Sequence, residues 1–127
     1  MDPAPPVTEA EIAGLVDAFY RRVRADPVLA PVFHAAIGEG EAEWAAHAAR
    51  LCHFWSSLMR RSGAYHGDPY SAHLRLPGLT PAMFAHWLAL FAETCAERFP
   101  PELAAAFTER AGRVARSLRL GLFGQAA

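Results

Sequence analysis

Apolar residues recur at helical spacing in four long stretches of this chain, and turn-forming residues separate the stretches. The first stretch begins at Thr8, because Glu11 stands three positions later and completes a capping-box pattern. It ends at Asp26-Pro27, since proline stops a helix. Its apolar positions are Ile12, Leu15, Val16, Phe19, Tyr20 and Val23. They share one face, so this helix is predicted to have one buried side.

A short piece and a second long helix come next. Residues 28–34 are predicted to turn Val32 and Phe33 inward, and two glycines after them mark a turn. The long helix is predicted over residues 41–61, where Ser62-Gly63 follows. Its inward stripe consists of Trp44, His47, Leu51, Phe54, Trp55 and Leu58.

Two further long helices follow an irregular segment over residues 64–79. Thr80 as N-cap and Pro81 in the first helical position predict a helix to about residue 98. A Pro-Pro pair then precedes a last helix that ends near residue 120. The inward positions are Phe84, Trp87, Leu88, Phe91 and Cys95, and then Leu103, Phe107, Ala111, Val114 and Leu118. The sequence has no strand pattern and no repeat, so we predict an all-α fold.

The composition indicates a single domain over residues 1–127, with a Pro-rich and flexible start over residues 1–7. Hydrophobic residues make up 53% and charged residues 20%, as in soluble globular chains. The net charge of −1 lacks the basic footprint of proteins that bind nucleic acid or anionic membranes. We find no signal peptide and no membrane span, and expect a cytoplasmic protein. Cys52 and Cys95 form no metal or disulfide motif and are expected to be buried thiols.

One polar group stands on each of three predicted inward faces: Tyr20, His47 and Trp87. Buried Tyr and Trp side chains usually need hydrogen-bond partners, and a buried His costs stability unless it has one. Core packing alone is the simpler interpretation of most inward residues. Three polar groups on faces that must meet favour a polar-lined pocket in an apolar core, which is typical of a small-molecule or cofactor site.

The segment that carries His73 is broken by Gly and Pro between two strongly apolar helices. Residues 65–91 read YHGDPYSAHLRLPGLTPAMFAHWLALF. A regular helix would pack better than this irregular segment does. A short, kinked segment can instead present the His73 imidazole to a buried group. The alternative is an ordinary histidine in a surface loop. The pattern therefore favours a buried ligand site.

Five motifs taken together resemble the truncated haemoglobins, and specifically their third group. The motifs are DAFYRRVRADP (17–27), CHFWSSLM (52–59), the segment over residues 65–91, RFPPELAAAF (98–107) and RVARSLRLGLF (113–123). The resemblance covers residues 15–123, nearly the whole chain. The glycine pairs that mark the other two groups are missing, which favours the third.

The resemblance implies a two-over-two helical sandwich around a haem b, iron protoporphyrin IX. It places His73 as the proximal iron ligand, with the opposite coordination site open. His47 falls at the distal position, where it either lines the ligand pocket or acts as a second iron ligand. Tyr20 and Trp87 match distal hydrogen-bond donors. Leu51 would touch the distal face of the haem, and the haem-packing or core positions are Phe19, Phe54, Trp55 and Phe91.

The function that the resemblance implies is the binding of dioxygen, carbon monoxide, nitric oxide or a similar small ligand. Oxygen transport is one use of such a site. Donors such as Tyr20 and Trp87 slow the release of dioxygen, which suits chemistry or sensing better than bulk transport. The catalytic options are oxidation of nitric oxide to nitrate and peroxidase-like turnover, with an electron-donor reductase. The sequence does not decide whether the protein is an enzyme.

Two rival interpretations use the same residues differently. A zinc or other non-haem metal site could draw on several of the six histidines. The chain has no H-E-x-x-H motif, no histidine pair at i,i+4 and no Cys-rich set, which argues against that site. A haem-free helical interaction module of globin-like shape would purify colourless and stay colourless when haemin is added.

The remaining histidines are given weaker interpretations. His53 and His86 are expected to face solvent rather than to function. His66 or Arg75 could lie near the haem propionates. A backbone carbonyl of residues 70–72 is the expected partner of the free ring nitrogen of the proximal histidine.

Overall fold

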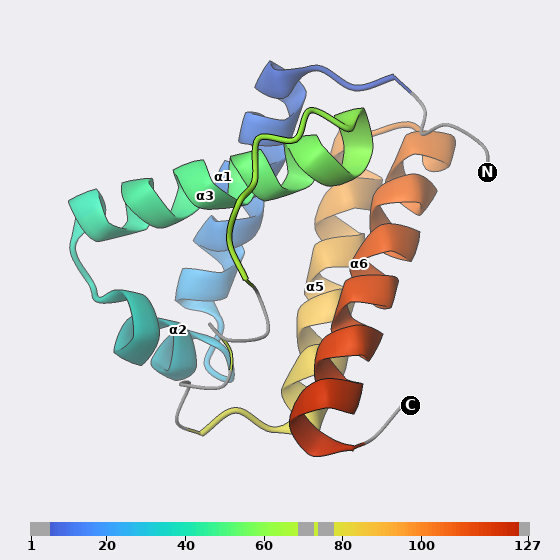
Figure 1. The fold of residues 1–127 in the computed structure, drawn as a ribbon. Helices are drawn as coiled ribbons and strands as arrows, with labels where there is room; N and C mark the ends of the chain where they lie inside the picture. Colours follow the sequence, from blue (N-terminus) through green and yellow to red (C-terminus); the bar gives the residue numbers. More distant parts are fainter. Residues whose placement is uncertain (1–5, 69–72, 74–77, 125–127) are drawn as a thin grey trace.

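The protein is described by a computed structural model that places residues 6–68, 73 and 78–124. This part of the chain contains five helices and no strand (Figure 1). The helices are α1 Glu9–Ala25, α2 Ala30–Ile37, α3 Glu41–Arg60, α5 Pro81–Arg98 and α6 Pro101–Phe123. The predicted all-α fold, with four long helices and a short one, is confirmed. A search of the described residues for a helix that could cross a membrane finds none.

Helix α1 starts with the capping box that the sequence predicted. Thr8 Oγ1 accepts a hydrogen bond from the Glu11 N–H at 3.1 Å, and Glu11 Oε1 accepts one from the Thr8 N–H at 2.9 Å. Val7, which we placed in the flexible start, is instead only 5% exposed. Its carbonyl accepts a hydrogen bond from Arg60, so the core begins one residue before the cap.

The corner between α1 and α2 differs from the prediction by two residues. Asp26 ends α1, and its Oδ1 accepts hydrogen bonds from the Val28 N–H at 2.9 Å and the Leu29 N–H at 3.0 Å. These bonds hold both residues in a turn. Helix α2 therefore begins at Ala30 and not at residue 28, and it reaches Ile37.

Helices α3 and α6 each end at a residue with positive φ. Arg61 follows α3 with φ 55° and Gly124 follows α6 with φ 71°, so both lie in the left-handed region that stops a helix. Helix α6 thus runs past its predicted end near residue 120. Ala115 is fully buried on its inner face, and Val114, predicted there, is half-buried beside it.

The long helices form two packed pairs, as a two-over-two sandwich requires. Helix α1 packs on α3, and α5 packs antiparallel to α6, while α1 also contacts α5 (Figure 1). The N-terminal half of α3 extends away from the α5–α6 pair, and α2 lies below it in the same view. The start of α3 is therefore covered by α1 and α2 and not by α5 or α6.

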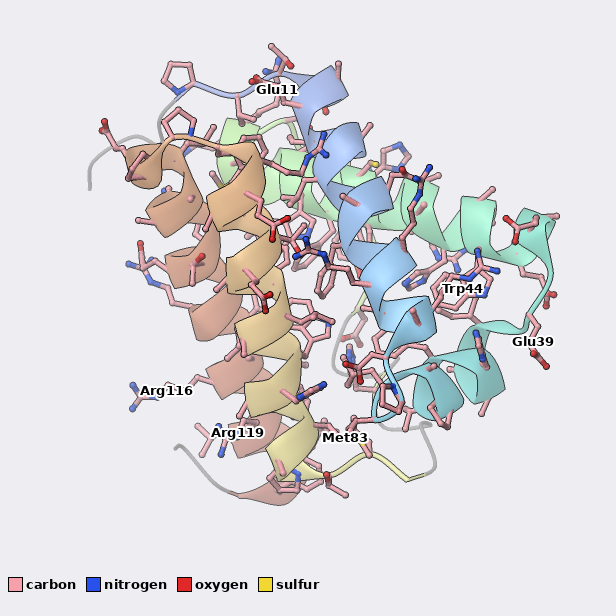
Figure 2. The ribbon with its side chains drawn as sticks, turned by 180° about the vertical axis from the view of Figure 1, so that it is seen from behind. Glu11, Glu39, Trp44, Met83, Arg116 and Arg119 are labelled. Carbon is pink, nitrogen blue, oxygen red and sulfur yellow. The ribbon has the colours of Figure 1, made fainter. Side chains whose placement is uncertain are left out.

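Trp44 fixes the corner between α2 and α3 (Figure 2). Its indole N–H donates to the Gly38 carbonyl at 2.8 Å. Its ring stacks on Phe33 with centroids 6.4 Å apart, and the Arg24 guanidinium lies 4.8 Å from its centroid. The corner that carries Phe33 is held in place by these contacts.

The centre of the fold is a closed set of aromatic rings. Phe19 and Phe91 are 1% exposed, Trp55 is 2% exposed and Phe107 is completely buried. The Trp55 ring stacks on Phe91 at 5.0 Å and contacts Phe107 at 5.5 Å. Cys95 is also completely buried, and burial raises the pKa of its thiol to about 12, as expected for an unreactive core cysteine.

Candidate ligand-binding site

An apolar pocket lies where the corner between α1 and α2 meets the start of α5. Met83, one of its lining residues, is at the N-terminal end of α5, beside the end of α1 (Figure 2). The described lining residues are all hydrophobic: Leu29, Val32, Phe33, Leu79, Met83, Phe84 and Trp87. The cavity has a volume of about 40 Å³. Its walls thus suit an apolar ligand, and Trp87 supplies the one N–H donor among them.

Tyr20 is buried beside this pocket at the inner face of α1. It is 7% exposed and makes edge contacts with Phe19 at 5.0 Å and with His47 at 5.2 Å between ring centroids. Burial raises the pKa of its hydroxyl, and a hydrogen bond from Trp87 lowers it less strongly. Tyr20 is therefore a neutral phenol whose O–H is a hydrogen-bond donor.

Trp87 joins the pocket to the aromatic core. Its ring stacks on Phe91 with centroids 5.2 Å apart and planes at 7°, and Phe19 contacts it edge-on at 5.2 Å. Its indole N–H can only donate, and Trp87 lies close enough to Tyr20 to lower the pKa of that hydroxyl, so Tyr20 is the acceptor of the pair. That leaves the Tyr20 O–H available to another acceptor.

His47 carries a buried nitrogen with no partner. It lies on α3 near Tyr20 and 6.0 Å from the Trp44 ring, and its Nε2 has no hydrogen-bond partner among the described residues. Burial lowers the pKa of His47 to about 4, with smaller contributions from Arg50 and His73. The imidazole is therefore neutral at pH 7. A buried nitrogen left unpaired in this way costs stability, which indicates a role other than packing.

His73 is described as a single residue with helical backbone and a half-buried side chain. Its ring lies 6.3 Å from that of Phe84, which lines the pocket. It is also close enough to His47 to affect the pKa of that residue. Its sequence neighbours, with the expected carbonyl of residues 70–72 and the expected propionate partner Arg75, lie outside the described residues.

The other predicted site residues divide between an open face and the closed core. Leu51 and Phe54 are half-buried along the same stripe of α3 as His47, and Phe54 contacts Tyr65 edge-on at 5.1 Å. Trp55, Phe19 and Phe91 belong to the aromatic core and not to the pocket wall. The structure therefore brings together four of the nine predicted residues around the pocket: Tyr20, His47, His73 and Trp87.

The sequence did not identify most of the pocket wall. Leu29, Met83 and Leu79 line it, yet none of them was a predicted site residue. Val32, Phe33 and Phe84 were predicted to face inward, which is the only signal that they gave. Helical periodicity marks buried positions, but it does not distinguish a core position from a pocket wall.

The remaining histidines fall in different surroundings. His53 and His66 are exposed, as predicted for His53. His86 keeps 41% exposure of its side chain but also lies 2.7 Å from an oxygen of Asp26, a contact that the sequence did not predict. Three or more metal-binding side chains do not come together anywhere in residues 6–68, 73 and 78–124. These ranges thus hold no donor set of the kind that binds structural zinc.

Comparison with known proteins points in one direction. No family model matches the chain. The curated protein "Group 3 truncated hemoglobin ctb" of Campylobacter jejuni is 35% identical over 109 residues, which span 86% of each chain. A crystal structure of a group III truncated hemoglobin from Campylobacter jejuni superposes with a TM-score of 0.89 over 96% of both chains, at 32% identity.

Proposed function

We propose a role for each polar residue of the pocket on the premise that this chain belongs to the group III truncated haemoglobins, globins that bind ligands at a haem. In this proposal His73 holds the iron of a haem b. Dioxygen or another diatomic gas binds on the side of Tyr20, His47 and Trp87. The observation that carries the proposal is the contact of Tyr20 with His47 beside an apolar pocket that Trp87 lines, with His47 Nε2 buried and unpartnered among the described residues.

The chemistry of the pocket fits a haem. A porphyrin is largely apolar, and so are the walls of the cavity. At about 40 Å³ the cavity is smaller than a porphyrin, so binding has to move side chains apart. Leu51, Phe54 and Leu58 are half-buried along one face of α3 and can move without breaking the closed core. When bound, the haem supplies an iron with one open coordination site for a gas.

The proximal role is assigned to His73. A neutral imidazole is a good iron ligand, and one protein ligand leaves the opposite site free. Support comes from the position of His73 against Phe84, a residue of the pocket wall. His47 is the competing candidate for a bond to iron, because its Nε2 is neutral and unpaired.

The distal roles follow from how Trp87 and Tyr20 face each other. The Trp87 N–H can only donate, toward the Tyr20 oxygen, so the Tyr20 O–H is available to donate to a ligand. A haem would polarise a dioxygen held there, and the Tyr20 O–H would then donate to an acceptor with negative charge, a bond that contributes roughly 1.5–3 kcal/mol. Such a bond slows release about ten- to a hundredfold. Carbon monoxide is less polarised and should be affected less.

Slow release favours chemistry or sensing over bulk transport of oxygen. Two reactions suit a retained ligand: oxidation of nitric oxide to nitrate, and turnover of peroxide. Both require an electron-donor reductase as a partner. The polar distal side supports this choice because Tyr20 and His47 each offer a hydrogen-bonding group to the ligand, while the Trp87 indole faces Tyr20.

Absorption spectra of the purified protein test the proposal. We expect a Soret band in the ferric, ferrous and ferrous-carbonyl forms, either as isolated or after haemin is added. A five-coordinate ferrous spectrum supports His73 as the sole protein ligand, and a six-coordinate spectrum that becomes five-coordinate in His47→Leu assigns the second bond to His47. Protein that stays colourless with haemin would contradict the proposal and support a haem-free helical module.

A further inference from the structure

A contact between His86 and Asp26 joins the first half of α5 to the corner between α1 and α2. His86 Nε2 lies 2.7 Å from Asp26 Oδ2, although the residues are 60 positions apart in the chain. The Asp26 side chain is 12% exposed and the His86 side chain 41%. The contact is thus shielded from water mainly on the side of the carboxylate.

Both oxygens of the Asp26 carboxylate are in use. Oδ1 accepts the N–H groups of Val28 and Leu29, and Oδ2 contacts His86. Burial alone would raise the pKa of Asp26, but the hydrogen bonds from His86 and the two amides lower it further than burial raises it. Leu29 is 2% exposed and lines the pocket. The same carboxylate therefore holds the turn that carries Leu29 and the helix that carries Trp87.

Helix α5 has few other polar anchors near its start. Thr80 occupies its N-cap position but makes no side-chain capping bond. Among the described residues, the next hydrogen bond from α1 to α5 joins Arg22 to Thr94 at 3.0 Å, about two turns beyond His86. Losing the His86 contact would therefore remove the hydrogen bond that joins the described pocket end of α5 to the corner between α1 and α2.

We propose that His86 and Asp26 form a positioning pair that keeps the Trp87 indole facing Tyr20 and so slows release of the gas ligand. The inference rests on the proposed function of Trp87 on the distal side. His86 is adjacent to Trp87 in sequence and contacts Asp26 at the corner between α1 and α2, so the pair fixes the rotation of α5 about its axis. A small rotation would turn the indole N–H away from the Tyr20 oxygen.

The experiment compares dioxygen dissociation rates of the ferrous full-length protein by stopped-flow. His86→Leu removes the donor at similar size and should release dioxygen about two- to tenfold faster, as expected for loss of one modest hydrogen bond. His86→Gln restores an N–H near the Nε2 position and should stay close to wild type. His53→Leu, which changes an exposed histidine on α3, is the matched control and should have no effect.

A double variant tests whether His86 acts through Trp87. In a Trp87→Phe background, His86→Leu should cause no further change in the off-rate. In the haem-free protein, the Trp87 indole N–H, identified by its loss in Trp87→Phe, should exchange with solvent faster in His86→Leu and not in His53→Leu.

Two results would overturn the inference. One is a wild-type off-rate and wild-type indole exchange in His86→Leu, and the other is an equal rise in off-rate with and without Trp87. A different result would contradict the proposed function first: if Trp87→Phe leaves the dioxygen off-rate unchanged, Trp87 does not act on the ligand through Tyr20, and the positioning role falls with it.

Discussion

Two tryptophans stack on Phe91 and mark two regions of the molecule. The ring of Trp55 lies 5.0 Å from that of Phe91 with planes at 13°, and the ring of Trp87 lies 5.2 Å away with planes at 7°. Trp55 is 2% exposed and its next neighbour is Phe107, in the closed aromatic core. Trp87 is half-buried, lies close enough to Tyr20 to lower the pKa of its hydroxyl, and lines the pocket.

The difference lies in the surroundings of each indole and not in its stacking. Around Trp55 the neighbouring side chains are the aromatic rings of Phe91 and Phe107, which it contacts directly. Around Trp87 the polar atoms of Tyr20 and His47 are buried, and His47 Nε2 is left without a partner among the described residues. A buried polar group without a hydrogen-bond partner lowers the stability of the fold by about 1–3 kcal/mol, so packing alone does not explain why His47 is there. The aromatic core therefore accounts for stability, and the pocket end carries the polar groups on which the proposed ligand site depends.

Removing His73 is the most severe test of the pocket end. We expect His73→Ala to lose most of its haem, because the remaining contacts lack a bond to iron, and to keep its helical fold because the core is elsewhere. Soret absorbance after gel filtration and far-UV circular dichroism measure the two effects. His53→Ala, at an exposed position on α3, should retain the haem. Full retention of spectrally normal haem in His73→Ala would contradict the proximal assignment.

The two tryptophans should respond differently to truncation. Trp55→Ala opens a cavity in the closed core and should lower the free energy of unfolding by about 3–5 kcal/mol. Trp87→Ala removes a half-buried ring and should cost less. Urea unfolding of the haem-free protein measures both. Equal losses would show that Trp87 belongs to the core as fully as Trp55 does.

Substitutions by phenylalanine test the two hydrogen-bonding groups. Tyr20→Phe removes only the hydroxyl, whereas Trp87→Phe removes the indole N–H and also makes the ring smaller. Each should release dioxygen about ten- to a hundredfold faster while changing the release of carbon monoxide less. Stopped-flow kinetics on both gases measure the effect, and Trp55→Phe is the matched control in the core. If dioxygen release were unchanged in both Tyr20→Phe and Trp87→Phe, the polar groups at the pocket end would have no role in holding the gas.

Local sequence signals predicted the fold well because helices are local structures. The Thr8 capping box, the Asp26-Pro27 break and the Pro81 start act within a few residues, and all three ends were placed correctly. From the residues alone, the site was predicted at the polar positions of inward faces and at His73 in the segment broken by Gly and Pro, and the other site residues came from the family resemblance. Met83 and Leu79 are apolar like their neighbours and gave no signal, and the contact between His86 and Asp26 joins residues too distant for any periodic pattern.

Acid should weaken the pocket end before the core. The pKa of His47 is lowered from its ordinary 6.5 to about 4 in the fold, so the unfolded chain binds the proton more tightly. Stability is therefore complete above pH 6.5 and is lost as the pH falls toward 4, by on the order of 1–3 kcal/mol from this group. Urea unfolding of the haem-free protein above pH 6.5 and at pH 4 measures the loss of stability. His47→Leu should lose less stability on acidification; an equal loss would mean that His47 is not the cause.

The smallest expected effect is the difference between Thr8 and Thr80, which occupy the N-cap positions of α1 and α5. Thr8 makes both bonds of a capping box at the start of α1, so Thr8→Ala should lower the free energy of unfolding by about 1 kcal/mol. Thr80 occupies the same position before α5 but makes no side-chain bond, so Thr80→Ala should change stability by a few tenths of that at most. Thermal unfolding of the haem-free variants side by side measures the difference. If Thr80→Ala cost as much as Thr8→Ala, the pocket end of α5 would have its own cap and would not depend on contacts such as that of His86 with Asp26.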